Sequence, residues 1–306
     1  MSFQLKILGS NSAMPAYGRH HSAQLLNVQN HHFLIDCGEA TQIQLSRYKC
    51  KTLRINHIFI SHLHGDHYLG LMGLIFTMHL LRRKSDLYIF GQKGLREIIT
   101  TQLKYSDTIL NYNIRFKELN PNEPELLFED NTIEVSSFPL FHRVPCCGFL
   151  FKEKSKPVRL NKDKLPQKIS LAHIGLLKKG EDIYDDQGKL LHRNKDLTLP
   201  PRKSRSYAYC SDTKYEESII PHIKGVDLLY HEATFLNERE MWASQTFHST
   251  TSQAAEIAKK ANVGQLVIGH YSARYNDVTP FLTEAKAVFN NTILATEGEA
   301  IDIPDL

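Results

Sequence analysis

Apolar and polar positions alternate in short runs along the first part of the chain, which predicts β-strands joined by tight turns. Residues 3–8 (FQLKIL) alternate regularly, and Ile55–Ile60 reads as a buried strand rich in β-branched residues. The other predicted strands are Ala23–Val28, His32–Cys37, Leu87–Phe90, Ile114–Leu119, Thr132–Phe141, Cys147–Phe151, Tyr207–Cys210, Leu228–Tyr230, Leu266–Ile268 and a final strand pair.

Segments whose apolar residues have helical spacing lie between these strands. Apolar residues recur every three or four positions within 66–83, which indicates a helix there. Further helices are predicted at 38–49, 93–103, 216–223, 251–261 and 279–289. Strand runs with helices between and after them fit an α/β protein in which two sheets pack face to face under outer helices.

Length and composition favour one soluble domain spanning residues 1–306. The amino terminus lacks the pattern of a signal peptide, and the longest apolar stretch, Leu69–Leu81, is too short to cross a bilayer. We therefore expect a cytoplasmic protein without membrane contact. The five cysteines lack CxxC spacing, so buried thiols are expected.

One segment differs from the rest of the chain in its balance of charged residues. Residues 152–205 carry 15 Lys or Arg against 7 Asp or Glu, whereas the rest of the chain carries 22 against 26. Periodicity is weak in the same segment. We expect an insertion that protrudes as a basic arm, either gripping a polyanion or simply lying solvated at the surface.

The main chemical signal is the sequence SHLHGDH at residues 61–67, which follows the apolar strand 55–60. Three imidazoles and one carboxylate within six residues are zinc-type ligands, and they are too many for one site that also takes ligands from elsewhere. His62 and His64 are expected to face one ion, and Asp66 and His67 a second. Paired metal ions perform phosphoester and amide hydrolysis.

Three more candidate ligands each follow an apolar strand. These residues are His142, Asp212 and His270. Each taken singly is more often a capping or core residue, but all three share the position at which side chains from neighbouring strands converge. The short carboxylate of Asp212 is suited to bridging two cations.

Together these residues resemble the metallo-β-lactamase superfamily and, within it, the short form of ribonuclease Z, the transfer-RNA 3′-processing endonuclease. Narrower motifs support the resemblance: LIDCGE at 34–39, SDT at 211–213, HEATF at 231–235 and HST at 248–250. It implies a four-layer αββα sandwich with two Zn²⁺ per subunit. His62, His64 and His142 would bind one zinc, Asp66, His67 and His270 the other, and Asp212 both.

The resemblance also implies functional roles. Asp66 would accept a proton from the attacking water, and His248, steadied by Glu232, would protonate the leaving ribose oxygen. From the residues alone, His248 reads as a helix-entry residue. The basic insertion would be the arm that grips the transfer-RNA precursor, with Lys178 and Lys179 in its most recognisable part. A Gly-Pro pair usual just upstream is absent.

The family forms homodimers, and the apolar positions in 71–78 are candidates for that interface as well as for the core. Two other activities remain open. One is a phosphodiesterase or other hydrolase of small molecules on the same fold, which would not need a basic arm. The other is a catalytically dead RNA-binding relative, which would be expected to lack metal ligands. Mn or Fe would suit similar ligands.

Overall fold

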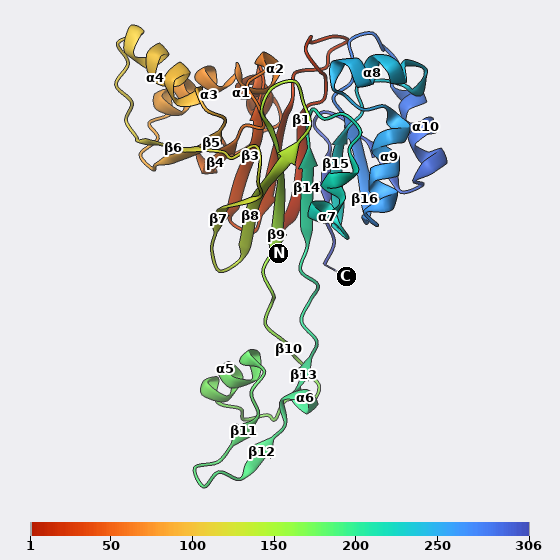
Figure 1. The fold of residues 1–306 in the computed structure, drawn as a ribbon. Helices are drawn as coiled ribbons and strands as arrows, with labels where there is room; N and C mark the ends of the chain where they lie inside the picture. The colour runs from red at the N-terminus through yellow and green to blue at the C-terminus, as the bar shows by residue number, and fades with distance from the viewer. Residues whose placement is uncertain (1, 306) are drawn as a thin grey trace.

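The computed structural model describes residues 2–305, and two seven-stranded sheets face each other in it (Figure 1). The first sheet, in spatial order, consists of β18 (Ala300–Asp302), β1 (Phe3–Gly9), β2 (Ala23–Val28), β3 (His31–Cys37), β4 (Ile55–Phe59), β5 (Leu87–Gly91) and β6 (Ile114–Glu118). The second consists of β17 (Thr292–Leu294), β16 (Gln265–Gly269), β15 (Leu228–Glu232), β14 (Ser206–Cys210), β9 (Cys146–Glu153), β8 (Ile133–Leu140) and β7 (Glu125–Glu129).

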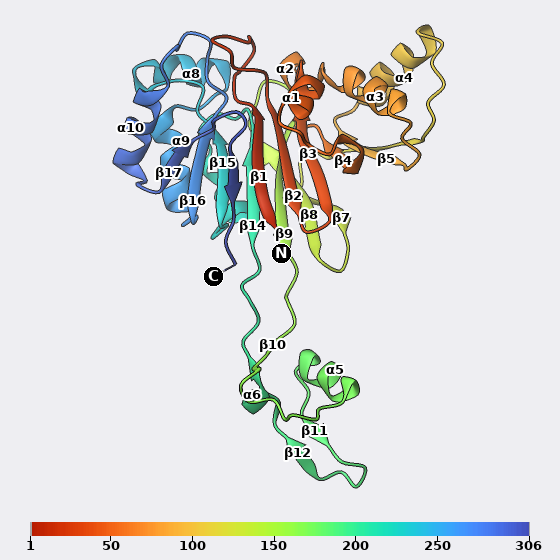
Figure 2. The same ribbon diagram turned by 180° about the vertical axis from the view of Figure 1, so that it is seen from behind.

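Helices cover the outer faces of both sheets, as Figures 1 and 2 show from opposite sides. The first sheet is flanked by α1 (Thr41–Arg47), α2 (Gly65–Tyr68), α3 (Leu71–Leu80) and α4 (Leu95–Tyr105). The second is flanked by α7 (Ile220–Ile223), α8 (Glu240–Thr246), α9 (Thr251–Lys260) and α10 (Thr279–Val288). Short 3-10 turns occupy Thr52–Arg54, Glu217–Ile219 and Asn237–Arg239. The predicted four-layer αββα sandwich is confirmed.

Three apolar clusters hold these layers together. Phe33, Phe59, Phe149 and Phe151 belong to the cluster between the two sheets and are fully buried. The other two clusters lie between each sheet and its helices. Strands in both sheets are therefore buried on two faces, which explains why several of them read as continuous apolar runs rather than alternating ones.

The segment between β9 and β14, residues 154–205, leaves the body and is called the arm below (Figure 1). Its small core contains Leu177, Ile183 and Leu197. At its base, the buried carboxylate of Glu153 accepts hydrogen bonds from the Arg205 guanidinium at 2.7 and 2.9 Å. The elements of the arm are β10 (Arg159–Leu160), α5 (Leu171–Lys179), β11 (Ile183–Tyr184), β12 (Leu190–His192), α6 (Asn194–Leu197) and β13 (Thr198–Leu199).

Several predicted elements differ in detail. The helix predicted over 66–83 is divided into α2 and α3 at Gly70, whose backbone N–H donates to the carbonyl of Cys37 at 2.9 Å rather than within the helix. Gly70 also packs so close to Gly38 that a Cβ would lie 1.9 Å from the Gly38 carbonyl oxygen. β7 and α8 were not predicted. The last two strands do not pair with each other: β17 joins β16, and β18 joins β1.

The interface suggested for the apolar positions in 71–78 is wrong. Leu71, Leu74, Ile75 and Met78 are fully buried beneath the first sheet's helices, and they form part of the protein's own core. Among residues 2–305, no helix has the length and apolar character needed to span a membrane.

Candidate metal centre

The candidate ligands lie where the strands end. β14, β15 and β16 run parallel, so the residues that follow or end them, Asp212, Glu232 and His270, reach the same edge of the second sheet. The histidine loop follows β4 of the first sheet, and His142 follows β8. The fold thus brings together residues from distant parts of the chain, as expected at the carboxyl ends of parallel strands.

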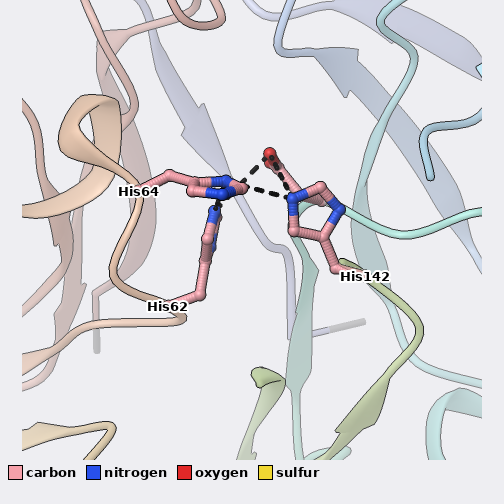
Figure 3. Close-up of side chains that lie close together, drawn as sticks. His62, His64 and His142 are labelled. Carbon is pink, nitrogen blue, oxygen red and sulfur yellow. Dashed lines mark hydrogen bonds and ion pairs between the residues drawn. The ribbon is translucent and has the colours of Figure 1, made fainter. Parts of the chain in front are cut away.

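Three histidines converge at one side of this edge. His62, His64 and His142 point toward one another (Figure 3). Nδ1 of His64 lies 3.1 Å from Nε2 of His62 and 3.1 Å from Nε2 of His142. Oδ2 of Asp212 lies 3.6 Å from Nε2 of His62 and 3.8 Å from Nε2 of His142. Four potential ligand atoms therefore surround one point.

A second group lies next to the first. Nε2 of His67 is 3.3 Å from Oδ2 of Asp66 and 3.3 Å from Oδ1 of Asp212. Nε2 of His270 is 3.1 Å from the same oxygen of Asp212. Asp212 therefore turns one carboxylate oxygen toward each group, which is the arrangement of a bridging ligand.

The donor set fits divalent metal. Ligand atoms bound tetrahedrally at about 2.1 Å lie about 3.4 Å from one another, and the donor separations in both groups are of this size. Both groups consist of imidazole and carboxylate atoms that lie within 4.8 Å of one another. These residues can hold one divalent ion in each group.

Electrostatics at the first group favours neutral imidazoles. Burial lowers the pKa of His62, His64 and His142, so each ring offers a lone pair at neutral pH. Burial of Asp212 opposes its ionisation, but the surrounding imidazoles, with His270 contributing most, hold its pKa well below the usual value. The first group therefore combines an ionised Asp212 carboxylate with neutral imidazoles that can bind a metal ion.

In the second group, the carboxylates act on His67. Burial disfavours a charged ring there, but Asp212, Asp66 and Asp36 together raise the pKa of His67 well above its usual value. Burial also opposes ionisation of Asp66, yet His67 and His270 lower its pKa. When a metal ion binds, the ion would take the place of the extra proton on His67. Ligation to the ion would then replace the attraction between this ring and the carboxylates.

A pair formed by one histidine and one glutamate lies beside the two ligand groups. Nδ1 of His248 lies 2.8 Å from Oε1 of the fully buried Glu232. Burial works against a charged His248, but the Glu232 carboxylate outweighs it and raises the pKa of His248 to about 9. Thr234 donates its hydroxyl to Oε2 of Glu232 at 2.7 Å and thereby fixes that carboxylate.

Asp36 supports the second group and was not among the predicted site residues. Its Oδ2 lies 2.7 Å from Nδ1 of His67 and accepts the hydroxyl of Tyr209 at 2.6 Å. Its Oδ1 accepts the backbone N–H of Ser61 at 2.7 Å. The sequence does carry a signal for Asp36, which is a charged residue beside the apolar residues 33–35 of a predicted strand. Asp36 is fully buried, and a buried carboxylate needs hydrogen-bond partners.

A cavity of about 530 Å³ opens over these groups. His64, Asp66, His142, Asp212, His248 and His270 all line it, and Arg143 and Arg274 add positive charge. His62, His67 and Glu232 lie beneath its lining. All nine residues predicted for metal binding and catalysis thus lie together, whereas Lys178 and Lys179 lie on α5 of the arm.

An αββα sandwich with His and Asp side chains gathered at this edge defines a protein of the metallo-β-lactamase class. Two family models match the chain. The model described as "Anti-Pycsar protein Apyc1" matches residues 3–172, and the model described as "Beta-lactamase superfamily domain" matches residues 197–271.

The full-length comparisons are more specific. The chain is 52% identical over 305 residues to "Ribonuclease Z" of Cytophaga hutchinsonii, covering 100% of this chain and 97% of that one. It is 45% identical to "Ribonuclease Z" of Bacteroides thetaiotaomicron, covering 98% and 95%. The crystal structure of human tRNase Z, short form, is 28% identical with a TM-score of 0.73, covering 98% and 99%. This chain belongs to the ribonuclease Z family.

Proposed function

We propose that the protein is a zinc-dependent endoribonuclease that removes the 3′ trailer from transfer-RNA precursors. Its products are a transfer RNA with a 3′-hydroxyl and a trailer with a 5′-phosphate. The observation that carries the proposal is the position of Asp212, whose two oxygens face two separate ligand groups in the cavity that also holds the His248–Glu232 pair. Full-length identity of 52% to a ribonuclease Z supports it.

We assign the seven metal-binding residues to two ions, according to the two groups described above. His62, His64 and His142 would hold one Zn²⁺, with Asp212 shared between the ions. The second Zn²⁺ would be held by Asp66, His67 and His270. Such a pair, when bound, supplies positive charge that makes water easier to deprotonate and offsets charge developing on the phosphoryl oxygens.

Asp66 serves as the proton acceptor. His67 and His270 keep its carboxylate ionised, and it lines the cavity where the substrate phosphate must enter. It can therefore accept a hydrogen bond from the attacking water, orient that water and take up its proton. Arg143 and Arg274 at the same cavity can bind non-bridging phosphate oxygens.

His248 serves as the proton donor. Glu232 accepts the Nδ1 proton of His248, so Nε2 is left to donate to the departing 3′-oxygen. A pKa near 9 keeps the ring protonated at neutral pH. A ribose alkoxide is a poor leaving group, so this proton is needed as the bond breaks.

The arm is proposed as the grip for transfer RNA. Lys178 and Lys179 are exposed in the last turn of α5, within the segment that carries the chain's excess of basic residues. Contacts from such residues to phosphates supply affinity without reading base sequence. We propose residues 152–205 as an inserted exosite in a chain that otherwise forms one domain.

We propose a homodimer, and the geometry of the arm supports it. β14 is five residues long, about 16 Å, and joins the arm at one end to the Asp212 loop at the other. The arm therefore leaves the body at the end of β14 opposite to the Asp212 loop (Figure 1), and we propose that it serves the cavity of a second subunit. Leu80, Leu81 and Ile109 are exposed apolar residues available to an interface. We propose the cytoplasm as the location, because transfer-RNA precursors occur there.

The test is His248→Ala, assayed on a precursor with a 3′ trailer by mapping the cut and measuring turnover. Loss of the general acid should lower turnover about 10²–10⁴-fold with unchanged zinc content. His31→Ala is the matched control, since that ring also lies 2.7 Å from a carboxylate, Asp130. Loss of zinc in the His248 variant would mean that this residue is a ligand rather than an acid.

The same assay separates the alternatives. A small-molecule phosphodiesterase would hydrolyse bis-(p-nitrophenyl) phosphate well and leave the precursor uncut. An inactive RNA-binding relative would contain almost no zinc, although this chain has all seven candidate ligands. Cleavage of the precursor at the trailer junction by the zinc-loaded chain supports the proposed function over both.

A further inference from the structure

A second cavity, of about 220 Å³, lies on the outer face of the first sheet beside the C-terminal end of α1. Its polar and aromatic lining consists of Lys6, Asn27, His32, Tyr48, Lys49 and Lys51. It shares no lining residue with the cavity over the candidate metal centre. Nothing in the proposed cleavage reaction makes use of this cavity.

Strand register places the floor of this cavity on one face. Gln4 of β1 is opposite Asn27 of β2, and Asn27 is opposite His32 of β3. Lys6 lies two residues beyond Gln4 on the same strand and therefore points to the same side. The side chains of three adjacent strands thus meet here, and the loop after α1 closes the cavity with Lys49 and Lys51.

The cavity is strongly cationic. Three ammonium groups line it, and its lining includes no carboxylate. Within residues 2–305, neither Lys6, Lys49, Lys51 nor the nearby Arg54 appears in any ion pair with an acidic side chain. Lys6 is half-buried, and its ammonium group lies 5.9 Å from the centre of the Tyr48 ring. Repulsion among like charges in a partly dry site is costly unless an anion neutralises them.

Two buried polar atoms in the floor have no partner within the protein. These are Oδ1 of Asn27 and Nδ1 of His32. Both atoms are covered in this conformation, so an anion would reach them only after the His32 ring or the Asn27 amide turns, which would present an Nδ1–H or NH₂ donor to the cavity. Burial lowers the pKa of His32, and the charges of Arg54 and Lys51 lower it further, so the ring is neutral at neutral pH.

We propose that this cavity binds a phosphate group, as inorganic phosphate or as the monoester of a mononucleotide. Several positive groups that converge on one small space match a compact dianion better than a monoanionic phosphodiester. At about 30 Å³ per water, the cavity has room for a phosphate ion with a few waters.

The experiment is calorimetric titration of the zinc-loaded full-length chain with inorganic phosphate, with AMP, and with a short single-stranded RNA that has no terminal phosphate. The double variant Lys6→Gln/Lys51→Gln should weaken binding of phosphate and AMP at least tenfold, since two charge-assisted contacts are removed. Lys84→Gln/Lys104→Gln, which makes the same charge change at exposed positions outside the cavity, should leave it unchanged. Zinc content and precursor cleavage should be the same in all three proteins.

Phosphate binding that is unaffected in the double variant would place the anion at the metal centre and overturn the proposal. RNA without a terminal phosphate that binds here as tightly as AMP would overturn the assignment to a monoester. If the double variant fails to fold, Lys49→Gln replaces it, because Lys49 is exposed in a loop. This single variant should weaken phosphate binding severalfold, and unchanged affinity would again contradict the proposal.

Discussion

Asp36 offers the sharpest test of how the fold prepares the second ligand group. The side chain is fully buried, and its two oxygens receive hydrogen bonds from Ser61 and Tyr209 besides facing His67. The contact of 2.7 Å to Nδ1 of His67 holds the proton on that nitrogen. Once a metal ion displaces the second proton of the ring, Nε2 of His67 is the nitrogen left to act as a ligand beside Asp66 and Asp212.

The substitution Asp36→Asn keeps the shape and removes the charge. An amide has one acceptor oxygen, so if that oxygen faces His67 and Tyr209, its NH₂ group meets the backbone N–H of Ser61. One unsatisfied buried donor costs about 1–3 kcal/mol, and weakening the charge-assisted bond to His67 costs about 1 kcal/mol more. We expect the free energy of unfolding to fall by about 2–4 kcal/mol.

The same substitution should act selectively on metal binding. Loss of the partner that orients a ligating imidazole lowers metal affinity by about 10–100-fold. The effect should fall on the site of His67 and His270, since the histidine that Asp36 contacts directly is His67, and its other partners are Ser61 and Tyr209.

Zinc titration against a competing chelator, together with urea unfolding, measures both effects. Asp86→Asn is the control, because it removes the same charge from a carboxylate bonded to Asn113 and Arg115 at the surface. If Asp36→Asn weakens both zinc sites equally, or neither, Asp36 does not orient His67 in the way described.

Two further predictions concern the arm. Deleting residues 154–203 should weaken binding of the transfer-RNA precursor but spare hydrolysis of bis-(p-nitrophenyl) phosphate, and equal loss of both activities would rule out a separate exosite. Glu153→Gln should lower the unfolding free energy by about 3 kcal/mol at pH 7, because it removes the buried carboxylate that accepts two hydrogen bonds from the Arg205 guanidinium. Although burial opposes it, hydrogen bonds from Arg205 and Lys156 lower the pKa of Glu153 to about 2. The stabilisation is therefore present above pH 4.5 and lost as the pH falls toward 2, so the urea midpoints of the two proteins should converge there, and a constant difference would contradict the assignment.

Much of the site could be predicted because its residues stand at strand ends. The sequence around His62 to His67 has a spacing that few other structures need, and Asp212 and His270 each follow an apolar run that is also a strand in the structure. The four-layer sandwich followed from the alternation of such runs with helical spacing.

Other features depend on tertiary contacts that the sequence does not display. The break between α2 and α3 coincides with a hydrogen bond from the backbone N–H of Gly70 to the carbonyl of Cys37, which lies on β3. The last two strands enter different sheets, one beside β16 and the other beside β1. The link between Asp36 and His67 joins positions 31 residues apart, and a single buried Asp gives its position but not its partner.

The central claim is that seven side chains bind two metal ions through the shared carboxylate of Asp212. The most direct measurement is the metal content per chain of the purified protein and of Asp212→Ala, determined by mass spectrometry under identical loading. The account predicts two zinc ions in the unaltered chain and at most one in the variant. One ion or none in the unaltered chain, or two ions retained by the variant, would contradict it.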